Sequence, residues 1–328
     1  MTIEQIKNDE KKRKEVNKIL KENNIPLSAT PYIILLHKIK VLDKTLEQLI
    51  NEYDLDNKEI IIDSFKPYHK YMTDELNEEL EKVVEDYEDI NIYFTSMGGS
   101  KDNNTIVLTP NYISEYMNFL LNLSEKSIVI DNCCGLGSLL LPAIDRKAKV
   151  IGIEYNPQIW SLCYINILLK TKEKPEIYLG DSFELIDKIK YQPTQAIINP
   201  PYNTPNKGME FIESALDKLV IGGRLAVIIQ NSVGSGKATE INKRILEKHT
   251  LATSITLPND IFIPFASVQT NIYLFVAHIP HDTKTKVRFV DFKDDGMKRT
   301  KRGITIKNKN RYAELMKITK TKGEPKYD

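Results

Sequence analysis

Hydrophobic residues recur with a helical period in the first hundred positions of the chain. Isoleucine, valine and leucine alternate there with runs of Lys and Glu at the spacing of an amphipathic helix, as at Ile3, Ile6, Val16, Ile19 and Leu20. The same spacing predicts further helices over 32–41, 46–53 and 74–87, with a break at Pro67. We therefore expect a helical N-terminal domain over residues 1–104, ending in the loop-forming composition of 97–104.

Beyond residue 105 the pattern changes to short apolar runs that alternate with amphipathic segments. The apolar runs predict seven strands, at 127–131, 149–154, 177–180, 195–199, 225–230, 254–257 and 272–277. Helices are expected between most of them, and repeated strand–helix units favour a doubly wound, mostly parallel α/β sheet. The last two runs have no crossover helix between them, so the final strand is expected to be antiparallel. This fold is predicted over 105–280, followed by a basic tail over 281–328.

Composition excludes several classes of protein. The longest apolar runs, 31–37 and 138–144, are far shorter than the roughly 20 residues of a membrane span, and the N-terminus lacks the apolar segment of a signal peptide. Three cysteines and five scattered histidines show no metal-ligand spacing. We therefore expect a cytoplasmic protein with no membrane association and no metal.

The net charge of +1 conceals an asymmetry. Residues 51–90 hold 14 acidic and 4 basic residues, whereas 284–328 hold 15 basic and 6 acidic. The basic end favours a phosphate backbone as partner, and the acidic segment favours a protein partner. A solvated surface is the alternative for each.

The stretch Asn199-Pro200-Pro201-Tyr202 ends a buried apolar run, at the edge of the sheet where ligands of α/β proteins gather. The Asn199 side-chain carbonyl and the Pro200 backbone carbonyl are acceptors for a planar amino group, and Tyr202 offers a flat face for a base. Pro201 makes the segment rigid. The alternative is a simple Pro-Pro turn with Asn199 capping the loop.

Acidic residues follow three earlier strands at the same edge. Asp131 precedes a turn whose glycines, Gly135 and Gly137, permit close approach of a ligand, but the turn lacks the spacing that binds a pyrophosphate. Glu154 stands where such folds hold ribose hydroxyls, and Asp181 is placed to accept from an adenine amine. Together the acids predict a pocket for an adenosine without phosphates, with a cationic amino-acid tail near Asp131; singly, each acid is as well explained as a helix cap.

The neighbours Cys133, Tyr155 and Ser182 are assigned to the same pocket. Cys133 and Cys134 are interpreted as small buried thiols rather than nucleophiles.

Thr109 is predicted to cap a helix that begins with Pro110.

These motifs, in this order, resemble the S-adenosylmethionine-dependent amino-methyltransferases of DNA, and closest of all the modification subunit of type I restriction-modification systems. The similarity runs from about Thr109 to about Gly296, and includes Gly222-Gly223-Arg224 and Leu257-Pro258 besides the segments above. The resemblance implies a Rossmann-like class I methyltransferase fold, S-adenosylmethionine as cofactor, and methylation of adenine N6 in DNA. It also implies contact of Thr109 with the cofactor tail, and a restriction subunit as a partner. Either a separate specificity subunit or, crudely, the basic tail is expected to read the DNA sequence.

A base inside a duplex is out of reach, so the resemblance implies base flipping and stacking on Tyr202. Phe265 or Phe262 is expected on the other face of the base, although both are also explained as core residues. Two alternatives stay open. One is an N5-glutamine protein methyltransferase of the release-factor type, which shares Asn-Pro-Pro-Tyr. The other is a non-catalytic subunit that binds cofactor and DNA.

Overall fold

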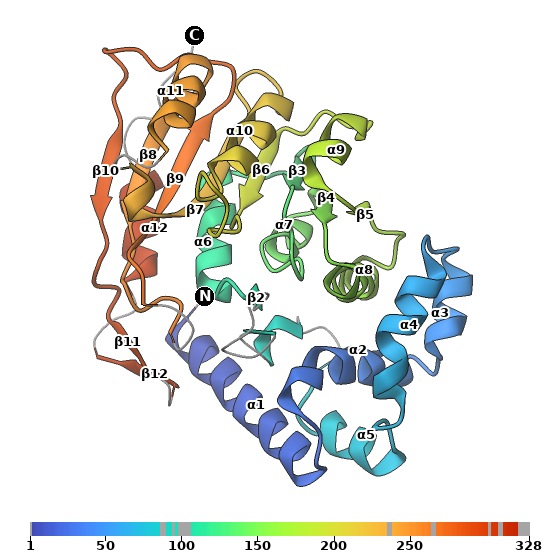
Figure 1. Ribbon diagram of the computed structural model, residues 1–328. Coiled ribbons are helices and arrows are strands. Elements are labelled where there is room, and N and C mark those ends of the chain that lie inside the picture. Colours follow the sequence, from blue (N-terminus) through green and yellow to red (C-terminus); the bar gives the residue numbers. More distant parts are fainter. Residues whose placement is uncertain are drawn as a thin grey trace.

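A computed structural model describes residues 2–85, 90–93, 96–97, 106–234, 238–263, 267–300, 303–307 and 311–320 (Figure 1). A mixed α/β body carries the sheet, and the N-terminal helices form a separate layer beside it (Figure 1). Within the described ranges, no helix is both long enough and apolar enough to cross a bilayer.

The N-terminal layer contains five α-helices: α1 Ile3–Glu22, α2 Thr30–Val41, α3 Leu46–Glu52, α4 Lys58–His69 and α5 Asp74–Glu81, with single 3₁₀ turns at Leu27–Ala29 and Ile90–Ile92. Capping boxes start two of them, because Thr2 and Thr45 each bond reciprocally with the Gln three residues later. The helical prediction is thus confirmed, but the break at Pro67 is wrong. Pro67 lies inside the last turn of α4, whose Ile61 and Phe65 are buried; tertiary packing outweighs the lost hydrogen bond.

The central sheet has eight strands, not seven, in the order β10-β8-β9-β7-β6-β3-β4-β5. The strands are β3 Ile128–Asp131, β4 Lys149–Glu154, β5 Ile177–Leu179, β6 Gln195–Ile198, β7 Arg224–Gln230, β8 Thr250–Thr256, β9 Thr270–Val276 and β10 Arg288–Asp291. As predicted, β9 is antiparallel to both of its neighbours, while the other pairs are parallel. A short antiparallel pair, β1 Ser96–Met97 and β2 Ile106–Val107, precedes the sheet.

Each face of the sheet is covered by its own hydrophobic core, as expected for a doubly wound fold. Alternate residues of one strand enter the two cores: Ile197 packs in one and Ile198 in the other. The first core includes side chains of α6 Asn111–Leu121, α7 Leu141–Asp145 and α8 Pro157–Thr171, and α2 and α4 pack on the outer side of α8. The second core includes side chains of α10 Met209–Lys218 and α11 Thr239–Lys248. The short helix α9 Ser182–Leu185 continues into a 3₁₀ turn at Ile186–Lys188, and another 3₁₀ turn spans Asn231–Gly234.

The segment predicted as a basic tail is instead partly built into the fold. Residues 288–291 form β10, which pairs with β8 at the edge of the sheet, and β11 Met297–Thr300 with β12 Gly303–Ile306 forms a hairpin. The following helix, α12 Tyr312–Lys320, packs on α6. β10 forms because it pairs with β8, a segment distant in the sequence. Its four residues are too few for an alternating pattern to predict a strand. The remaining part of the tail lies outside the described residues, and the boundaries at 104 and 280 stay predictions.

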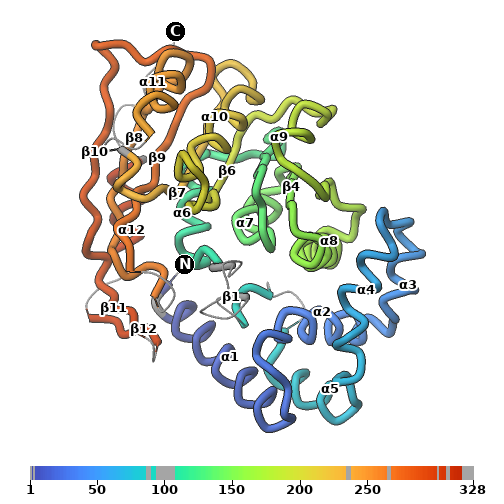
Figure 2. The backbone as a smooth tube through the Cα atoms, in the orientation of Figure 1, coloured from blue at the N-terminus to red at the C-terminus, as the bar shows by residue number. Residues whose placement is uncertain are grey.

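Helix α1 and the β11–β12 hairpin, which come from opposite ends of the sequence, lie side by side (Figure 2). The backbone amide of Ile304 donates to Glu10 Oε2 on α1 at 3.1 Å, and Glu10 is buried there. Arg299 on β11 lies in a second buried contact: its Nη1 donates to Asp260 at 2.8 Å, its Nε donates to the Tyr112 hydroxyl at 2.7 Å, and it also pairs with Asp295. The hairpin is therefore fixed to α1 and α6 by desolvated charge-assisted hydrogen bonds.

Candidate functional site

The predicted acids and Asn199 meet at one edge of the sheet. Asp131 and Glu154 are the last residues of β3 and β4, Asp181 follows β5 by two residues, and Asn199 comes directly after β6. These four strands are parallel and lie side by side in the order β6-β3-β4-β5, so their carboxyl ends share an edge (Figure 1). This is the edge at which doubly wound folds bind ligands.

Asp131 lies at the bottom of this edge with only 1% of its surface exposed. Its Oδ1 accepts from the backbone amide of Cys133 at 3.1 Å. Burial raises the pKa of Asp131 to about 7, because desolvation disfavours the carboxylate. A cationic group of a ligand would restore the ionised form.

Glu154 joins the glycine turn to the start of α8. One carboxylate oxygen accepts from the Gly135 amide at 3.0 Å and the other accepts from the Asn156 amide at 2.8 Å. Burial is also the main cause of its raised pKa. Asn156 in turn caps α8 by accepting from the amides of Gln158 and Ile159. Glu154 thus shapes the loop while its remaining lone pairs stay available to a ligand hydroxyl.

The glycine turn has the backbone geometry that close approach requires. Gly135 has φ +54° and Gly137 has φ +80°, values that side-chain-bearing residues rarely adopt. A side chain at Gly135 would meet no atom within 4 Å, so open space lies beside its Cα. Gly137, by contrast, packs against Cys163. Gly135 therefore faces the space a ligand would fill, and Gly137 serves packing.

Asp181 acts as the cap of α9, the simple alternative for each acid. Its Oδ1 accepts from the Phe183 amide at 2.7 Å. Beside it, the Ser182 hydroxyl is buried and has no hydrogen-bond partner in the described structure. A buried hydroxyl without a partner is costly, so this oxygen is an unfilled contact for a polar ligand.

One aromatic residue near Asp181, Phe183, was missed in the sequence, whereas Tyr155 was assigned to the pocket. Phe183 is 46% exposed, its ring lies 4.8 Å from the ring of Phe211 on α10, and Tyr155 is 75% exposed directly after Glu154. Exposed aromatic rings beside a polar pocket offer stacking surfaces for a planar base. The signal was available, since Phe183 follows Asp181 by two residues and Tyr155 was assigned only as a neighbour of Glu154.

Asn199 lies between two hydroxyl groups. Its Nδ2 donates to Thr109 Oγ1 at 3.1 Å, and its Oδ1 accepts from the Tyr202 hydroxyl at 2.7 Å. The prediction that Thr109 caps α6 is wrong, because Pro110 occupies the cap position and makes no side-chain hydrogen bond there. Neither does Asn199 cap its own loop, since both described contacts of its amide are to side chains. The simple turn interpretation is therefore not supported.

The rest of the Asn-Pro-Pro-Tyr segment fills two environments. Pro201 is exposed, whereas Tyr202 is partly buried and packs against the core that α10 and α11 cover. Desolvation raises the pKa of the Tyr202 hydroxyl, which therefore stays protonated. Pro200 lies against Gly208, where an added side-chain carbon would come within 2.8 Å of the proline ring. Phe262 is buried in the core, and Phe265 lies outside the described residues.

Cys134 and Cys163 are buried thiols, whereas Cys133 is half-buried. Cys134 Sγ lies 3.9 Å from Cys163 Sγ, and this contact, followed by burial, raises the pKa of Cys134, while desolvation raises the pKa of Cys133. A thiol with a raised pKa is a poor nucleophile. No group of three or more metal-ligating side chains occurs among the residues that the structure covers.

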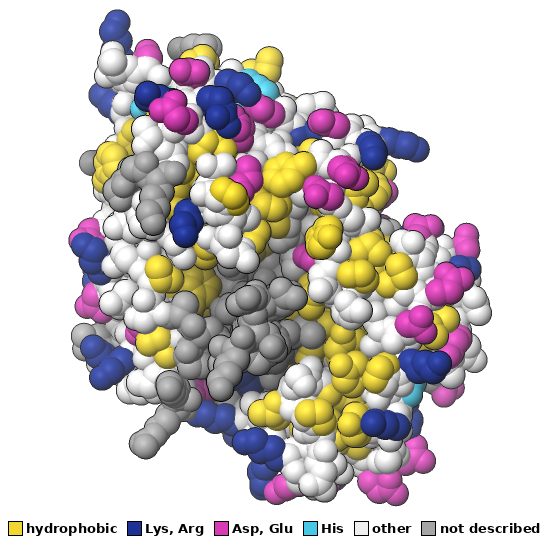
Figure 3. Space-filling model, viewed as in Figure 1, with side chains coloured by type: hydrophobic (Ala, Val, Ile, Leu, Met, Phe, Trp, Pro, Cys, Tyr) yellow, Lys and Arg dark blue, Asp and Glu magenta, His cyan; other side chains and the backbone are white. Residues whose placement is uncertain are grey.

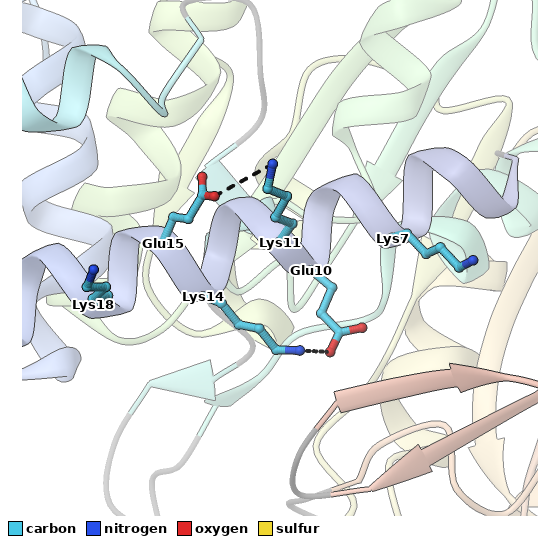
Figure 4. A pocket seen from close by; sticks show the side chains of 6 residues that line it. All are labelled: Lys7, Glu10, Lys11, Lys14, Glu15 and Lys18. Carbon is cyan, nitrogen blue, oxygen red and sulfur yellow. Dashed lines mark ion pairs between the residues drawn. The ribbon is translucent and has the colours of Figure 1, made fainter.

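Charged side chains gather away from this edge. Acidic side chains lie over α3 and α4, and Lys and Arg side chains line α1 at the lower edge of the molecule (Figure 3). A groove of about 400 Å³ along α1 is lined by Lys7, Glu10, Lys11, Lys14, Glu15 and Lys18 (Figure 4). The lysines share one face because their spacing follows the helical period. Lys11 pairs with Glu15, Lys14 with Glu10 and Lys18 with Glu22, so the positive excess of the face is small.

The sequence of this chain matches the model of a known protein family. The family model described as N-6 DNA Methylase matches residues 81–210 and 203–327, which is more than half of the chain. The chain belongs to the N-6 DNA methylase family. S-adenosylmethionine is the cofactor that this membership implies, and the buried Asp131, the open space at Gly135 and the unpaired Ser182 hydroxyl fit a polar, cationic ligand of that kind.

Several characterised proteins are similar in sequence. The type II restriction enzyme and methyltransferase RM.BcgI of Heyndrickxia coagulans is 29% identical over 261 residues, covering 69% of this chain and 41% of that protein. The type I restriction enzyme EcoKI methylase subunit of Escherichia coli K12 is 33% identical over 213 residues, covering 51% of this chain and 39% of that protein. The chain thus spans less than half the length of these relatives.

Solved structures of this family share the fold. A modification subunit of a putative type I restriction enzyme from Vibrio vulnificus YJ016 has a TM-score of 0.60 at 18% identity, covering 82% of this chain and 67% of that one. A type I restriction-modification methyltransferase subunit from Streptococcus thermophilus has a TM-score of 0.59 at 19% identity, covering 88% and 73%. The predicted class I methyltransferase fold is therefore confirmed.

Proposed function

We propose that this N-6 DNA methylase transfers a methyl group from S-adenosylmethionine to the N6 amine of adenine in DNA. The observation that carries the proposal is the position of Asn199, one strand away from Asp131 at the same edge of the sheet. An amide acceptor beside a pocket for a cationic donor is what methylation of a planar amine requires.

Cofactor binding is proposed for the residues assigned from the sequence. The Asp131 carboxylate would bind the ammonium group, Glu154 the ribose hydroxyls, and Asp181 with the Ser182 hydroxyl the adenine. Gly135 leaves room for the amino-acid part, and Cys133 and Gly137 support the turn. The exposed rings of Tyr155 and Phe183 would cover the adenine faces. When bound, the cofactor supplies an electrophilic methyl group.

Asn199 and Pro200 would bind the target amine. The lone pair of the adenine amine is delocalised into the ring, so the nitrogen is a weak nucleophile. Donation of its two N–H groups to Asn199 Oδ1 and the Pro200 carbonyl would draw the nitrogen towards a tetrahedral shape and turn its lone pair to the methyl group. Tyr202 would stack on the base once it is flipped from the duplex. Phe265 is proposed for the opposite face.

DNA as substrate is supported by the family and by charge. The lysine face of α1 offers cations at the spacing of a helix, suited to phosphates. The basic C-terminal segment contributes less than its composition indicates, because Arg299 is neutralised by Asp260 and Asp295. The relatives named as type I methylase subunits support a specificity subunit and a restriction subunit as partners.

A labelled-methyl assay tests the proposal. Purified protein is incubated with radiolabelled S-adenosylmethionine and genomic DNA free of N6-methyladenine, with and without a type I specificity subunit, and the modified base is identified by mass spectrometry. We expect label in N6-methyladenine, its loss in Asn199→Ala, and unchanged cofactor binding by that variant. Label in a protein glutamine, or normal transfer by Asn199→Ala, would overturn the proposal.

A further inference from the structure

Thr109 contacts the proposed catalytic amide directly. Its Oγ1 accepts the Nδ2–H of Asn199 at 3.1 Å, across 90 residues of sequence. Thr109 is only 3% exposed, so water cannot easily replace it at this position. The contact brings the segment before α6 onto the end of β6.

The local sequence leaves this hydroxyl available. A Thr before Pro would usually cap the helix, but Pro110 is the cap residue, and its carbonyl accepts from the amides of Ile113 and Ser114. The Thr109 hydroxyl is thus not used by the first turn of α6. It can bond to a group outside its own helix.

The orientation of the Asn199 amide decides whether it can accept an amine. The amide has a carbonyl edge and an NH₂ edge of nearly equal size, and only the carbonyl edge can accept. With the NH₂ edge on Thr109, the carbonyl edge faces Tyr202, the residue proposed to hold the base. The reversed amide would direct N–H groups at the N–H groups of the target.

We propose that Thr109 is a positioning residue for methyl transfer, which holds Asn199 with its carbonyl oxygen towards the target amine. This inference rests on the proposed function, and it gives Thr109 a role on the amine side of the site rather than on the cofactor. Loss of the hydroxyl would leave the buried Nδ2–H of Asn199 without a partner and loosen the hold on the amide. The chemical step would slow while cofactor affinity would not change.

Isosteric variants test the inference. Thr109→Val removes the hydroxyl and keeps the shape, and Thr109→Ser keeps the hydroxyl. Thr250→Val is the matched control, because Thr250 is equally buried and donates to the Ile279 carbonyl at 2.8 Å, at the start of β8 on the opposite edge of the sheet. Each variant is compared for cofactor Kd by calorimetry, single-turnover methyl transfer, and the side-chain amide NMR signal of Asn199 in protein labelled with ¹⁵N-asparagine.

The expected pattern separates positioning from cofactor contact. For Thr109→Val we expect transfer about ten- to a hundredfold slower, an unchanged cofactor Kd, and a shifted Asn199 amide signal. Thr109→Ser should keep the wild-type rate and the wild-type amide signal, and Thr250→Val should change none of the three measurements. A cofactor Kd raised tenfold, or an unmoved Asn199 signal, would overturn the inference. The NMR and calorimetry results decide it even if wild-type protein methylates no adenine, an outcome that counts against the proposed function instead.

Discussion

The Tyr202 hydroxyl donates towards Asn199 Oδ1 at 2.7 Å and lies 3.1 Å from the carbonyl oxygen of Ile228. One hydroxyl carries one proton, so these two acceptors share it. The amide oxygen proposed to bind the target amine is therefore already engaged by its own neighbour. Entry of a base would exchange this internal hydrogen bond for one to the amine.

Substitutions at Tyr202 separate its hydroxyl from its ring. Tyr202→Phe removes the competing donor and keeps the stacking surface, so we expect transfer within about threefold of wild type. Tyr202→Ala loses a base–aromatic contact of roughly 1–3 kcal/mol, which predicts a KM for DNA raised about five- to a hundredfold. Steady-state kinetics with labelled cofactor measure both. Equal loss of activity in the two variants would contradict the stacking role.

Two glycines form a matched pair for testing the cofactor turn. Gly135 and Gly222 have φ values of +54° and +75°, and a side chain at either would meet no atom within 4 Å. Alanine at each position should cost about 1–2 kcal/mol of stability from the left-handed backbone alone. Only Gly135→Ala should also weaken cofactor binding, because its methyl group would enter the ligand space. Denaturant unfolding and calorimetry on both variants check this; weaker binding in Gly222→Ala would point to a global effect.

The Asp131 carboxyl predicts a pH dependence of cofactor affinity. With a pKa of about 7, it is mostly protonated at pH 6 and mostly ionised at pH 7.5. Only the ionised form attracts the ammonium group, so the affinity should rise roughly five- to tenfold over this range. Calorimetric titrations at several pH values measure the change. Asp131→Asn should bind more weakly and show a flat profile; the same slope in that variant would exclude Asp131 as its source.

His249 predicts acid sensitivity of the fold. It is fully buried, its Nδ1 accepts from the His278 amide at 3.0 Å, and its Nε2 lies 3.1 Å from Asp217. Burial lowers the pKa of His249 below the ordinary histidine value of 6.5, although the neighbouring Asp217 opposes this shift. The unfolded chain therefore binds a proton first as the pH falls below about 6.5, and stability should decrease by up to about 1.4 kcal/mol per pH unit there.

Urea unfolding between pH 7.5 and 5.5 measures this loss. The exposed His69 provides the control, since His69→Gln should keep the slope while His249→Gln should reduce it. A slope that survives His249→Gln would assign the acid sensitivity to another group.

Local sequence signals predicted most of the fold and the outline of the site. Apolar runs located the strands from β3 to β9, and the positions of Asp131, Glu154 and Asn199 at strand ends followed from the runs themselves. These features depend on a few consecutive residues, so a single sequence reveals them. Phe183 could also have been predicted as a site residue, because it follows Asp181 by only two residues.

The features that were missed depend on contacts between distant segments. β10 has four residues and forms because β8 is beside it. Thr109 reads as a helix cap by sequence, but Pro110 takes that position and the hydroxyl turns to Asn199. From composition alone Arg299 contributes to a basic surface, but the structure buries its side chain, which bonds to three partners. Each outcome is decided by tertiary structure.

The pairing of β10 with β8 also determines how short a stable fragment of this protein can be. A fragment cut at residue 280, where composition places the end of the catalytic domain, would leave the backbone groups along one side of β8 without partners. An exposed strand edge of this kind pairs with other chains, so the shortened protein would aggregate. The smallest fragment worth expressing extends past Asp291.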